Sequence, residues 1–288
     1  IRKRLIQLKL PLVENAESHS LRDMLPAFFR NFLLCLVVTC SVANSHGLEI
    51  SEPFNYTAGL ALSGLNGGTN WGGAWTGSGT STIQSPNLDF PGSSETGNKA
   101  VLGYNGTTYD NFRLLNSVID QNAFSSVSFS FLFNLTGNDA ETGIRFAGLS
   151  FFNGGTEQIF FGKPGNTTEV GYHKYAGGTD VAGVDVSFNS STVFRFVANI
   201  TFNPSGDDLM TIALTDNFGS VNQTWSNLNL GESFAFDRIR LIRDTALDSG
   251  INPEFDEISF TTVPEPATWS LLAGAATAGL LLRRRRHG

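Results

Sequence analysis

The sequence predicts an all-β protein whose strands form a two-sheet antiparallel sandwich, and three observations support this fold class. Apolar and polar residues alternate with a period of two along many segments between Gly47 and Thr262, as they do in strands with one buried face. Clusters of Gly, Asn, Pro, Asp and Ser separate these segments, which is typical of tight turns. Gly, Ser, Thr and Asn are abundant whereas Lys and Met are scarce, a composition that disfavours a helix bundle.

The clearest strand is predicted at Val127–Leu135. Five apolar side chains of this segment share one face, and Ser128, Ser130 and Asn134 lie opposite. Thr192–Phe202 repeats the pattern. Further strands are predicted at Ile144–Phe152, Gln158–Gly162, Val170–Tyr175, Leu209–Thr215, Phe234–Ile242 and Glu254–Phe260. One short helical turn is expected at Asp110–Asn122. Many strands with Phe-rich inner faces predict two packed sheets.

A secretory signal peptide is predicted at residues 24–46. A basic start precedes the apolar run Phe32–Val38, and small residues follow it up to the expected cleavage site. Residues 1–23 are expected to come from a start site placed too early, with a genuine N-terminal extension as the alternative. Cys35 and Cys40 both lie in the signal, so the mature chain is expected to hold no disulfide.

The last residues, 263–288, combine three features with separate physical roles. The strip Val263, Pro264, Glu265 and Pro266 contains two prolines, which keep its backbone extended. A transmembrane helix is expected at 267–282. The four arginines that follow stay on the cytoplasmic side and act as a membrane stop: Arg283, Arg284, Arg285 and Arg286.

This arrangement resembles the PEP-CTERM sorting signal of Gram-negative bacteria, over about a tenth of the chain. The resemblance implies export by the Sec machinery and processing by an exosortase, a membrane-embedded cysteine protease of the transpeptidase type. We expect the proline-containing strip to be the processing site. The chain would be held in the inner membrane transiently and would then reach the cell surface or the extracellular matrix.

The apolar run Trp269–Leu282 is short for a permanent anchor. Its 14 residues span roughly 21 Å as a helix, against a hydrocarbon core of about 30 Å. An ordinary C-terminal tail anchor is the alternative, but it gives no reason for the strip Val263–Pro266. We therefore expect a weakly held segment that is removed.

Residues 47–262 form the predicted β-sandwich domain, which is acidic. They contain nine Lys and Arg residues against 22 Asp and Glu, so no binding of nucleic acid through charge is expected. Glu52–Tyr56, Gly67–Trp75 and Phe255–Ile258 resemble segments of exported PEP-CTERM proteins of planctomycetes and verrucomicrobia. That resemblance implies a concanavalin- or laminin-G-like jelly roll, in which the first and last strands lie close together, and no assigned reaction.

Catalytic chemistry has few candidates in this domain. His173 is its only histidine, which excludes a two-histidine metal site there, and it is most simply a strand surface residue. Jelly-roll glycosidases place acids at alternate positions of one strand. Asp256 and Glu257 are adjacent, so they are expected to point to opposite faces.

Carbohydrate binding is a better candidate than cleavage. Trp71 and Trp75 lie in a Gly-rich loop with Asn66 and Asn70 nearby. Two indole rings could form a face for sugar stacking, with amide hydrogen bonds to the hydroxyls. In the alternative, which we favour, the glycines let the loop cross the edge of the sandwich and the tryptophans cap the core.

Two functions therefore remain open. The first is a non-catalytic surface or extracellular-matrix protein sorted by an exosortase, with a carbohydrate such as an exopolysaccharide as its ligand. The alternative is a secreted carbohydrate-active enzyme, a glycosidase or lyase, on the same fold. No cofactor is predicted. Calcium at turn acids such as Asp139, Asp207 and Asp208 stays an open option, for which a solvated turn is the simpler interpretation.

Overall fold

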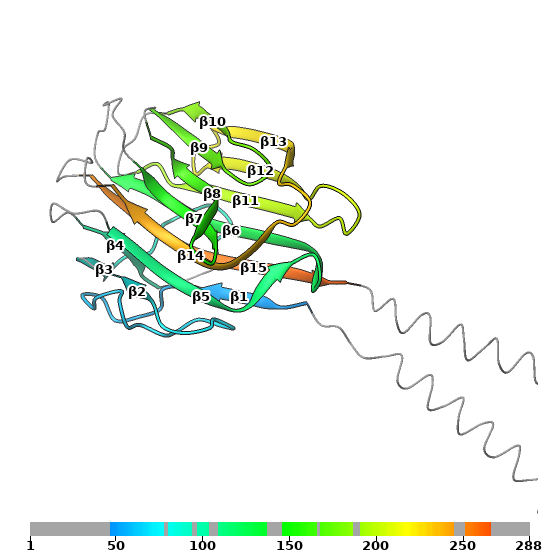
Figure 1. Ribbon diagram of the computed structural model, residues 1–288. Coiled ribbons are helices and arrows are strands. Elements are labelled where there is room, and N and C mark those ends of the chain that lie inside the picture. The colour runs from blue at the N-terminus through cyan, green and yellow to red at the C-terminus, as the bar shows by residue number, and fades with distance from the viewer. Residues whose placement is uncertain are drawn as a thin grey trace, which may run out of the picture. The chain divides into compact units, whose positions relative to one another are not determined.

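Two antiparallel β-sheets enclose a hydrophobic core in the computed structural model of the chain (Figure 1). The structure describes residues 47–77, 80–93, 97–103, 109–136, 146–165, 168–186, 191–244 and 251–265. The predicted signal peptide, the helix at 267–282 and Arg283–Arg286 lie outside these residues. Within the described ranges, no helix is long and apolar enough to cross a membrane. The predicted two-sheet antiparallel sandwich is confirmed.

The eight-stranded sheet has the order β13-β12-β11-β6-β15-β4-β3, with β1 also paired to β15. Its strands are β1 (Glu49–Glu52), β3 (Ser81–Gln84), β4 (Lys99–Leu102), β6 (Phe124–Thr136), β11 (Phe194–Thr201), β12 (Leu209–Asp216), β13 (Asn222–Asn229) and β15 (Asn252–Pro264). At its centre, Phe131 of β6 is in register with Phe196 of β11, and Phe129 with Phe260 of β15. Three neighbouring strands therefore present aromatic rings to the core.

The seven-stranded sheet has the order β10-β9-β8-β7-β14-β5-β2. Its strands are β2 (Thr76–Gly77), β5 (Tyr109–Asp120), β7 (Ala147–Asn153), β8 (Thr156–Lys163), β9 (Glu169–Lys174), β10 (Asp180–Asp185) and β14 (Ala235–Arg243). Gly148, Gly162, Gly171 and Gly183 are in register across four of these strands. A Cβ on Gly162, whose φ is +134°, would lie 2.3 Å from the carbonyl oxygen of Ala147. Only glycine therefore fits at this point of β8.

Phenylalanine dominates the core between the sheets. The ring of Phe129 lies 4.7 Å from that of Phe151 and 4.6 Å from that of Phe260. Phe151 stacks in turn on Phe236, with ring centroids 4.3 Å apart. Full burial of one such side chain contributes about 1.5–3 kcal/mol. The period-two phenylalanine pattern of the sequence therefore holds the two sheets together.

The first and last strands lie side by side, as the jelly-roll resemblance implies (Figure 1). Glu49 of β1 is in register with Thr261 of β15. Just beyond them, the Leu48 N–H donates to Thr262 Oγ1 at 2.8 Å, and the Thr262 N–H donates to the Leu48 carbonyl oxygen at 3.0 Å. The two ends of the described body are thus joined by backbone and side-chain hydrogen bonds.

The helical turn expected at Asp110–Asn122 is wrong, because this segment is strand β5. Its inward positions include Asn111, Arg113 and Leu115, all buried. Two of the three are polar, which hides the period-two pattern in the sequence. The inward amide is satisfied by its partner: Asn111 Nδ2 donates to Ser81 Oγ at 2.8 Å.

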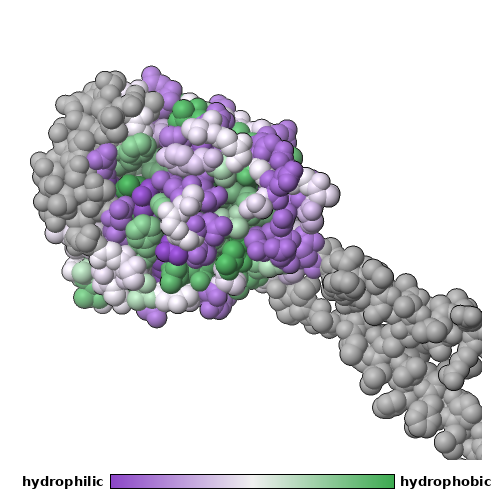
Figure 2. Space-filling model, viewed as in Figure 1, coloured by the Kyte–Doolittle hydropathy of each residue, from purple (hydrophilic) through white to green (hydrophobic). Residues whose placement is uncertain are grey.

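The described surface carries no single dominant patch in the view of Figure 2, where hydrophilic and hydrophobic residues are interspersed. This mixture is typical of a protein whose sheets bury their apolar faces against each other. Functional sites are therefore defined by particular pockets and segments rather than by a broad apolar face.

Candidate functional site

The predicted sorting strip begins inside the last strand of the body. Val263 and Pro264 are the last residues of β15 and pair with β6. The Glu265 N–H donates to the carbonyl oxygen of Ala123 at 3.2 Å. Val263 is 52% exposed. The strip is thus extended up to Glu265, whereas Pro266 lies outside the described residues.

The two tryptophans predicted as a sugar-stacking face pack against the core. Trp75 is 1% exposed, and its Nε1–H donates to Glu52 Oε2 at 3.0 Å. Trp71 is half-buried, its Nε1–H donates to the Ser51 carbonyl oxygen at 2.8 Å, and its ring meets Phe260 edge-on at 6.1 Å. Trp75 therefore offers no face to a ligand. This burial matches the alternative interpretation, in which the tryptophans cap the core.

The amides near the tryptophans hold the loop to neighbouring strands. Asn70 is exposed and has a φ of 59°, and its Nδ2 donates to the Glu49 carbonyl oxygen at 2.7 Å. Asn66 Oδ1 accepts from Arg113 Nη2 at 3.4 Å. Both side chains thus have partners within the protein, which gives them a role in fixing the loop.

Arg113 fills the space behind this loop. Its guanidinium carbon lies 4.7 Å and 5.5 Å from the ring centroids of the two tryptophans, within the range of cation–π attraction. Its Nε–H donates to the Gly73 carbonyl oxygen at 3.1 Å, and Nη2 donates to that of Gly67 at 2.5 Å. Its Nη1 pairs with Glu52, and neither side chain has exposed surface.

Glu52 is the acceptor at the centre of this network. Besides Arg113 and Trp75, the Tyr56 hydroxyl donates to it at 2.8 Å and the Phe54 N–H at 2.9 Å. A buried carboxylate needs this degree of satisfaction. Burial lowers the pKa of Arg113 to about 10, still far above neutral pH, so the guanidinium stays charged.

This network accounts for the segments Glu52–Tyr56 and Gly67–Trp75 as structural motifs. Sequence reasoning identified both segments but missed the ion pair, because Glu52 and Arg113 are 61 residues apart. The sequence signal for this pair was Arg113 at an inward position of an amphipathic segment. That signal is weak unless the segment is already recognised as a strand.

The two adjacent acids of β15 face the same loop, contrary to the expectation that they point to opposite faces. Glu257 has a φ of 48° and lies at a register shift of β15 against β6, a β-bulge. Asp256 Oδ2 accepts from the Leu88 N–H at 3.0 Å, and Glu257 Oε1 accepts from Ser93 Oγ. The extra residue of the bulge breaks the alternation and turns Glu257 to the side of Asp256.

Glu257 also lines a pocket of about 290 Å³ on that side of the eight-stranded sheet. Arg195 Nη2 lies 3.4 Å from Glu257 Oε2, and the hydroxyls of Ser130 and Ser259 are 2.8 Å apart. The Arg195 guanidinium packs over Phe90, 4.4 Å from the ring centroid. The polar groups of this pocket bond to one another, which is typical of a structural cluster.

His173 lies in β9 beside Tyr175, with ring centroids 4.2 Å apart and the Tyr175 hydroxyl 3.2 Å from His173 Nδ1. Burial lowers the pKa of His173, and Glu157 raises it to a smaller extent. Burial and then Glu157 raise the pKa of Tyr175 to about 12. Glu157 is paired with Arg240 at 2.6 Å. Both rings are therefore neutral at neutral pH.

Two of the turn acids considered for calcium, Asp207 and Asp208, accept hydrogen bonds that organise loops. Asp208 is buried, and its carboxylate accepts from the backbone N–H groups of Asn203 and Phe234, each at 2.8 Å. Asp207 Oδ2 accepts from Asn229 Nδ2 at 2.5 Å. In the part of the chain that the structure describes, no cluster of three His, Cys, Asp or Glu side chains is suited to a metal ion. Asp139 lies outside that part.

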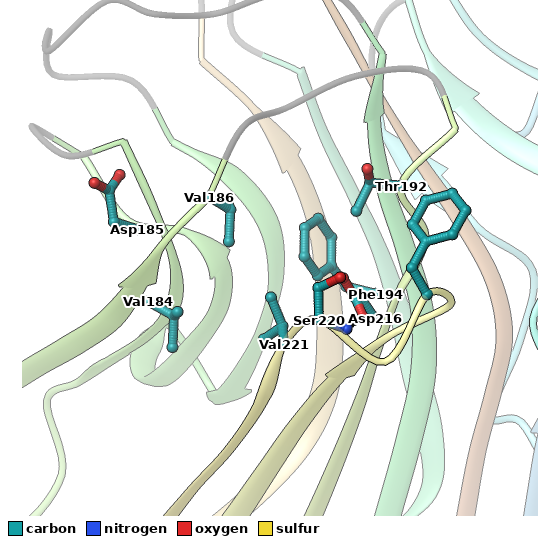
Figure 3. Close-up of a pocket in the computed structure, with 9 residues that line it drawn as sticks. Val184, Asp185, Val186, Thr192, Phe194, Asp216, Ser220 and Val221 are labelled. Atoms are coloured by element: carbon teal, nitrogen blue, oxygen red, sulfur yellow. Dashed lines mark hydrogen bonds between the residues drawn. The ribbon is translucent and has the colours of Figure 1, made fainter.

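A further pocket, of about 390 Å³, lies between the end of β10 and the turn that joins β12 to β13 (Figure 3). Figure 3 shows Val186 and Val221 on one side of the space and Thr192 and Phe194 on the other. The residues that line it are Val184, Asp185, Val186, Thr192, Phe194, Asp216, Phe218, Ser220 and Val221. The sequence analysis did not predict a functional role for any of them.

Several solved structures are similar to the chain at low sequence identity. Similar chains include a protein of unknown function from Shewanella oneidensis MR-1 (13% identity, TM-score 0.48, 88% of this chain and 98% of that one). Two others are the botulinum neurotoxin serotype C1 binding domain (13% identity, TM-score 0.44, 77% and 53%) and the PL-14 alginate lyase from Aplysia kurodai (8% identity, TM-score 0.42, 62% and 87%).

Comparison of sequences bears on the C-terminal segment. No curated protein matches the chain. Residues 262–286 match the family described as the PEP-CTERM protein-sorting motif. This match begins at Thr262, inside β15, and includes the proline-containing strip, the apolar run and the arginines. The chain therefore carries a PEP-CTERM protein-sorting motif, whose first residues are also the end of the β-sandwich.

Proposed function

We propose that the chain is an exported protein, delivered by an exosortase to the cell surface or the extracellular matrix, whose β-sandwich has a non-catalytic binding role. The observation that carries this proposal is the sorting motif at residues 262–286, because its first residues belong to β15. No linker separates the body from the motif. The sandwich itself is thus the cargo that the motif delivers.

Each part of the motif supplies one physical step of delivery. An arginine at the centre of a bilayer costs about 2.5–3.5 kcal/mol, so Arg283–Arg286 keep the tail in the cytoplasm after Sec-dependent export. The short apolar run at 269–282 holds the chain in the inner membrane only transiently. The exosortase then cuts in the strip Val263–Pro266 and frees the body from the membrane.

The state of the acids favours a binding role over hydrolysis. Asp256 accepts from the Leu88 N–H, and Glu257 is engaged by Ser93 and Arg195. A glycosidase needs one carboxyl group to donate a proton and a second to act as nucleophile or base. Carboxylates that are already bonded to backbone N–H groups and to a guanidinium are poor candidates for either role.

One observation favours the alternative, a carbohydrate-active enzyme. His173 and Tyr175 lie within hydrogen-bond distance of each other, and Glu157 and Arg240 are close by. A neutral imidazole next to a phenol can pass a proton, as lyase chemistry requires. If the protein is an enzyme, its reaction is therefore expected at this pair.

The test combines cell fractionation with polysaccharide binding. The full chain is followed in a host that contains an exosortase, and the surface-derived protein is applied to immobilised polysaccharides while new sugar ends are measured. We expect the protein in the surface or matrix fraction, with retention on a polysaccharide and no new ends. Retention in the cytoplasm would overturn the proposal. New ends that His173→Ala and Tyr175→Phe both abolish would establish the enzyme instead.

A further inference from the structure

The pocket of Figure 3 lies where edge strands of the two sheets end close together. β10 is the edge of the seven-stranded sheet, and β13 is an edge of the eight-stranded sheet. The lining comes from β10 and Val186 after it, from Thr192 just before β11 and Phe194 at its start, and from Asp216 of β12 with the turn that follows. Its volume of about 390 Å³ lies in the range of small-molecule sites, roughly 300–1,000 Å³.

Asp216 supplies a carboxylate with unused acceptor capacity. Its side chain is only 7% exposed. The Ser220 N–H donates to Oδ1 at 2.7 Å, and Oδ2 has no hydrogen bond to any residue in the described ranges. A carboxylate oxygen at the wall of a pocket can accept hydrogen bonds from the donors of a ligand. The hydroxyl groups of a ligand in the pocket would supply them.

Phe218 supplies an aromatic ring at the same pocket. It is 63% exposed, more than any other large hydrophobic side chain among the described residues. A phenylalanine this exposed contributes little to the core. Its apolar ring face is suited to pack against the C–H face of a sugar ring.

The turn that carries these two residues is fixed by the protein. The Asn217 N–H donates to the Val193 carbonyl oxygen at 2.9 Å, and Asn217 Oδ1 accepts from the Val193 N–H at 3.1 Å. Asn217 Nδ2 donates to the Ser191 carbonyl oxygen at 3.0 Å. The Asp216 N–H donates to the Val221 carbonyl oxygen at 3.2 Å. A turn held in this way loses little entropy when a ligand binds.

Charge narrows the ligand class. Among the residues that the structure describes, the lining contains Asp185 and Asp216 and no basic side chain, so this part of it disfavours uronates, phosphates and sulfated sugars. Thr192 and Ser220 add hydroxyl groups, which both donate and accept. We propose that this pocket binds a neutral sugar residue, whose hydroxyls donate to Asp216 and whose ring packs on Phe218. The inference rests on the proposed function and names the ligand class of its binding role.

The test is saturation-transfer NMR on the full chain in micelles of a sugar-free detergent. The probes are glucose, galactose, mannose and N-acetylglucosamine at millimolar concentration, with glucuronate as the anionic arm. We expect transfer to at least one neutral sugar and none to glucuronate. Phe218→Ala should weaken the affinity by about threefold to tenfold, and Asp216→Asn by at least as much.

The control variant is Val181→Ala, which removes a side chain that is 52% exposed on β10 and is not part of the pocket lining. It should leave the affinity unchanged. Because Phe218 is exposed, Phe218→Ala should also keep the melting temperature of the parent protein. Absence of transfer to every neutral sugar, or binding that survives Phe218→Ala, would overturn the inference.

Failure of this inference is distinguishable from failure of the proposed function. Export and processing are judged by where the protein lies in its host. A processed surface protein that binds none of the neutral sugars would remove the pocket proposal and leave the sorting proposal intact. A protein that binds glucose or mannose but stays in the cytoplasm would remove the sorting proposal and leave the pocket proposal intact.

Discussion

Glu52 and Arg113 form an ion pair in which neither side chain has any exposed surface. Glu52 ends β1 of the eight-stranded sheet, and Arg113 lies in β5 of the seven-stranded sheet. The pair therefore ties the two sheets together at the loop Gly67–Trp75. Buried ions of this kind are stable only while each keeps its partner.

Removal of the cation is expected to destabilise the fold strongly. Arg113→Met should lower the free energy of unfolding by about 3–5 kcal/mol, because Glu52 would keep a buried charge without its partner. The matched control is Arg238→Met, at a pair with Asp237 whose side chains are 31% and 26% exposed, where a loss below about 1 kcal/mol is expected. Urea unfolding measures both. Equal losses would contradict the assigned role of the buried pair.

Substitution of the two tryptophans is expected to change the stability of the protein, and to a different extent for each. Trp75→Ala should cost about 3–5 kcal/mol of unfolding free energy, as large aromatic truncations in a core do. Trp71→Ala should cost less, because Trp71 is only half-buried. Thermal melts of both variants give the comparison. A Trp75→Ala protein that melts like the parent would show that the ring does not cap the core.

Gly162, one of the four glycines in register across β7 to β10, is expected to tolerate no side chain. Gly162→Ala should cost at least about 1–3 kcal/mol, because its φ of +134° and the contact with the Ala147 carbonyl oxygen both oppose a Cβ. Gly155→Ala is the control, since no atom lies within 4 Å of the Cβ position there. A Gly162→Ala protein as stable as the control would refute the close approach of these strands.

A fragment of residues 47–265 is expected to show a β-type circular dichroism spectrum and one histidine titration, that of His173. Its pKa should lie below the ordinary 6.5, because burial outweighs Glu157. The unfolded chain then takes up a proton before the folded chain does. Unfolding free energy should accordingly fall as the pH drops below about 6.5, and His173→Gln should remove that slope. An NMR titration that gives His173 a pKa above 6.5 would show that Glu157 outweighs burial and would contradict this prediction.

The strands with phenylalanine at alternate positions could be predicted from the sequence. Val127–Leu135 lies within β6 and Glu254–Phe260 within β15, because a Phe-rich inner face leaves a period-two pattern. Strands β1 to β4, β10 and β13 were not predicted. Of these, β10 and β13 each pair with one neighbour at a sheet edge, and β13 consists only of half-buried and exposed residues.

The candidate sites also differ in how far the sequence predicts them. The sorting motif is linear, so its prolines, apolar run and arginines could be recognised in order. The pocket at Phe218 and Asp216 is lined by residues from three strands and a turn. No spacing in the sequence predicts it. The bulge at Glu257 likewise depends on one backbone angle, a φ of 48°, that no residue type in the segment requires.

Processing of the sorting motif is tested most directly by mass spectrometry of the mature protein from its native host. Glu265 is hydrogen-bonded to Ala123 at the end of the sandwich, so we expect the mature chain to end at Glu265 or Pro266. The apolar run and Arg283–Arg286 should be missing. A surface-fraction protein whose C-terminal peptide extends intact through Arg283 would show a lasting anchor and contradict the account.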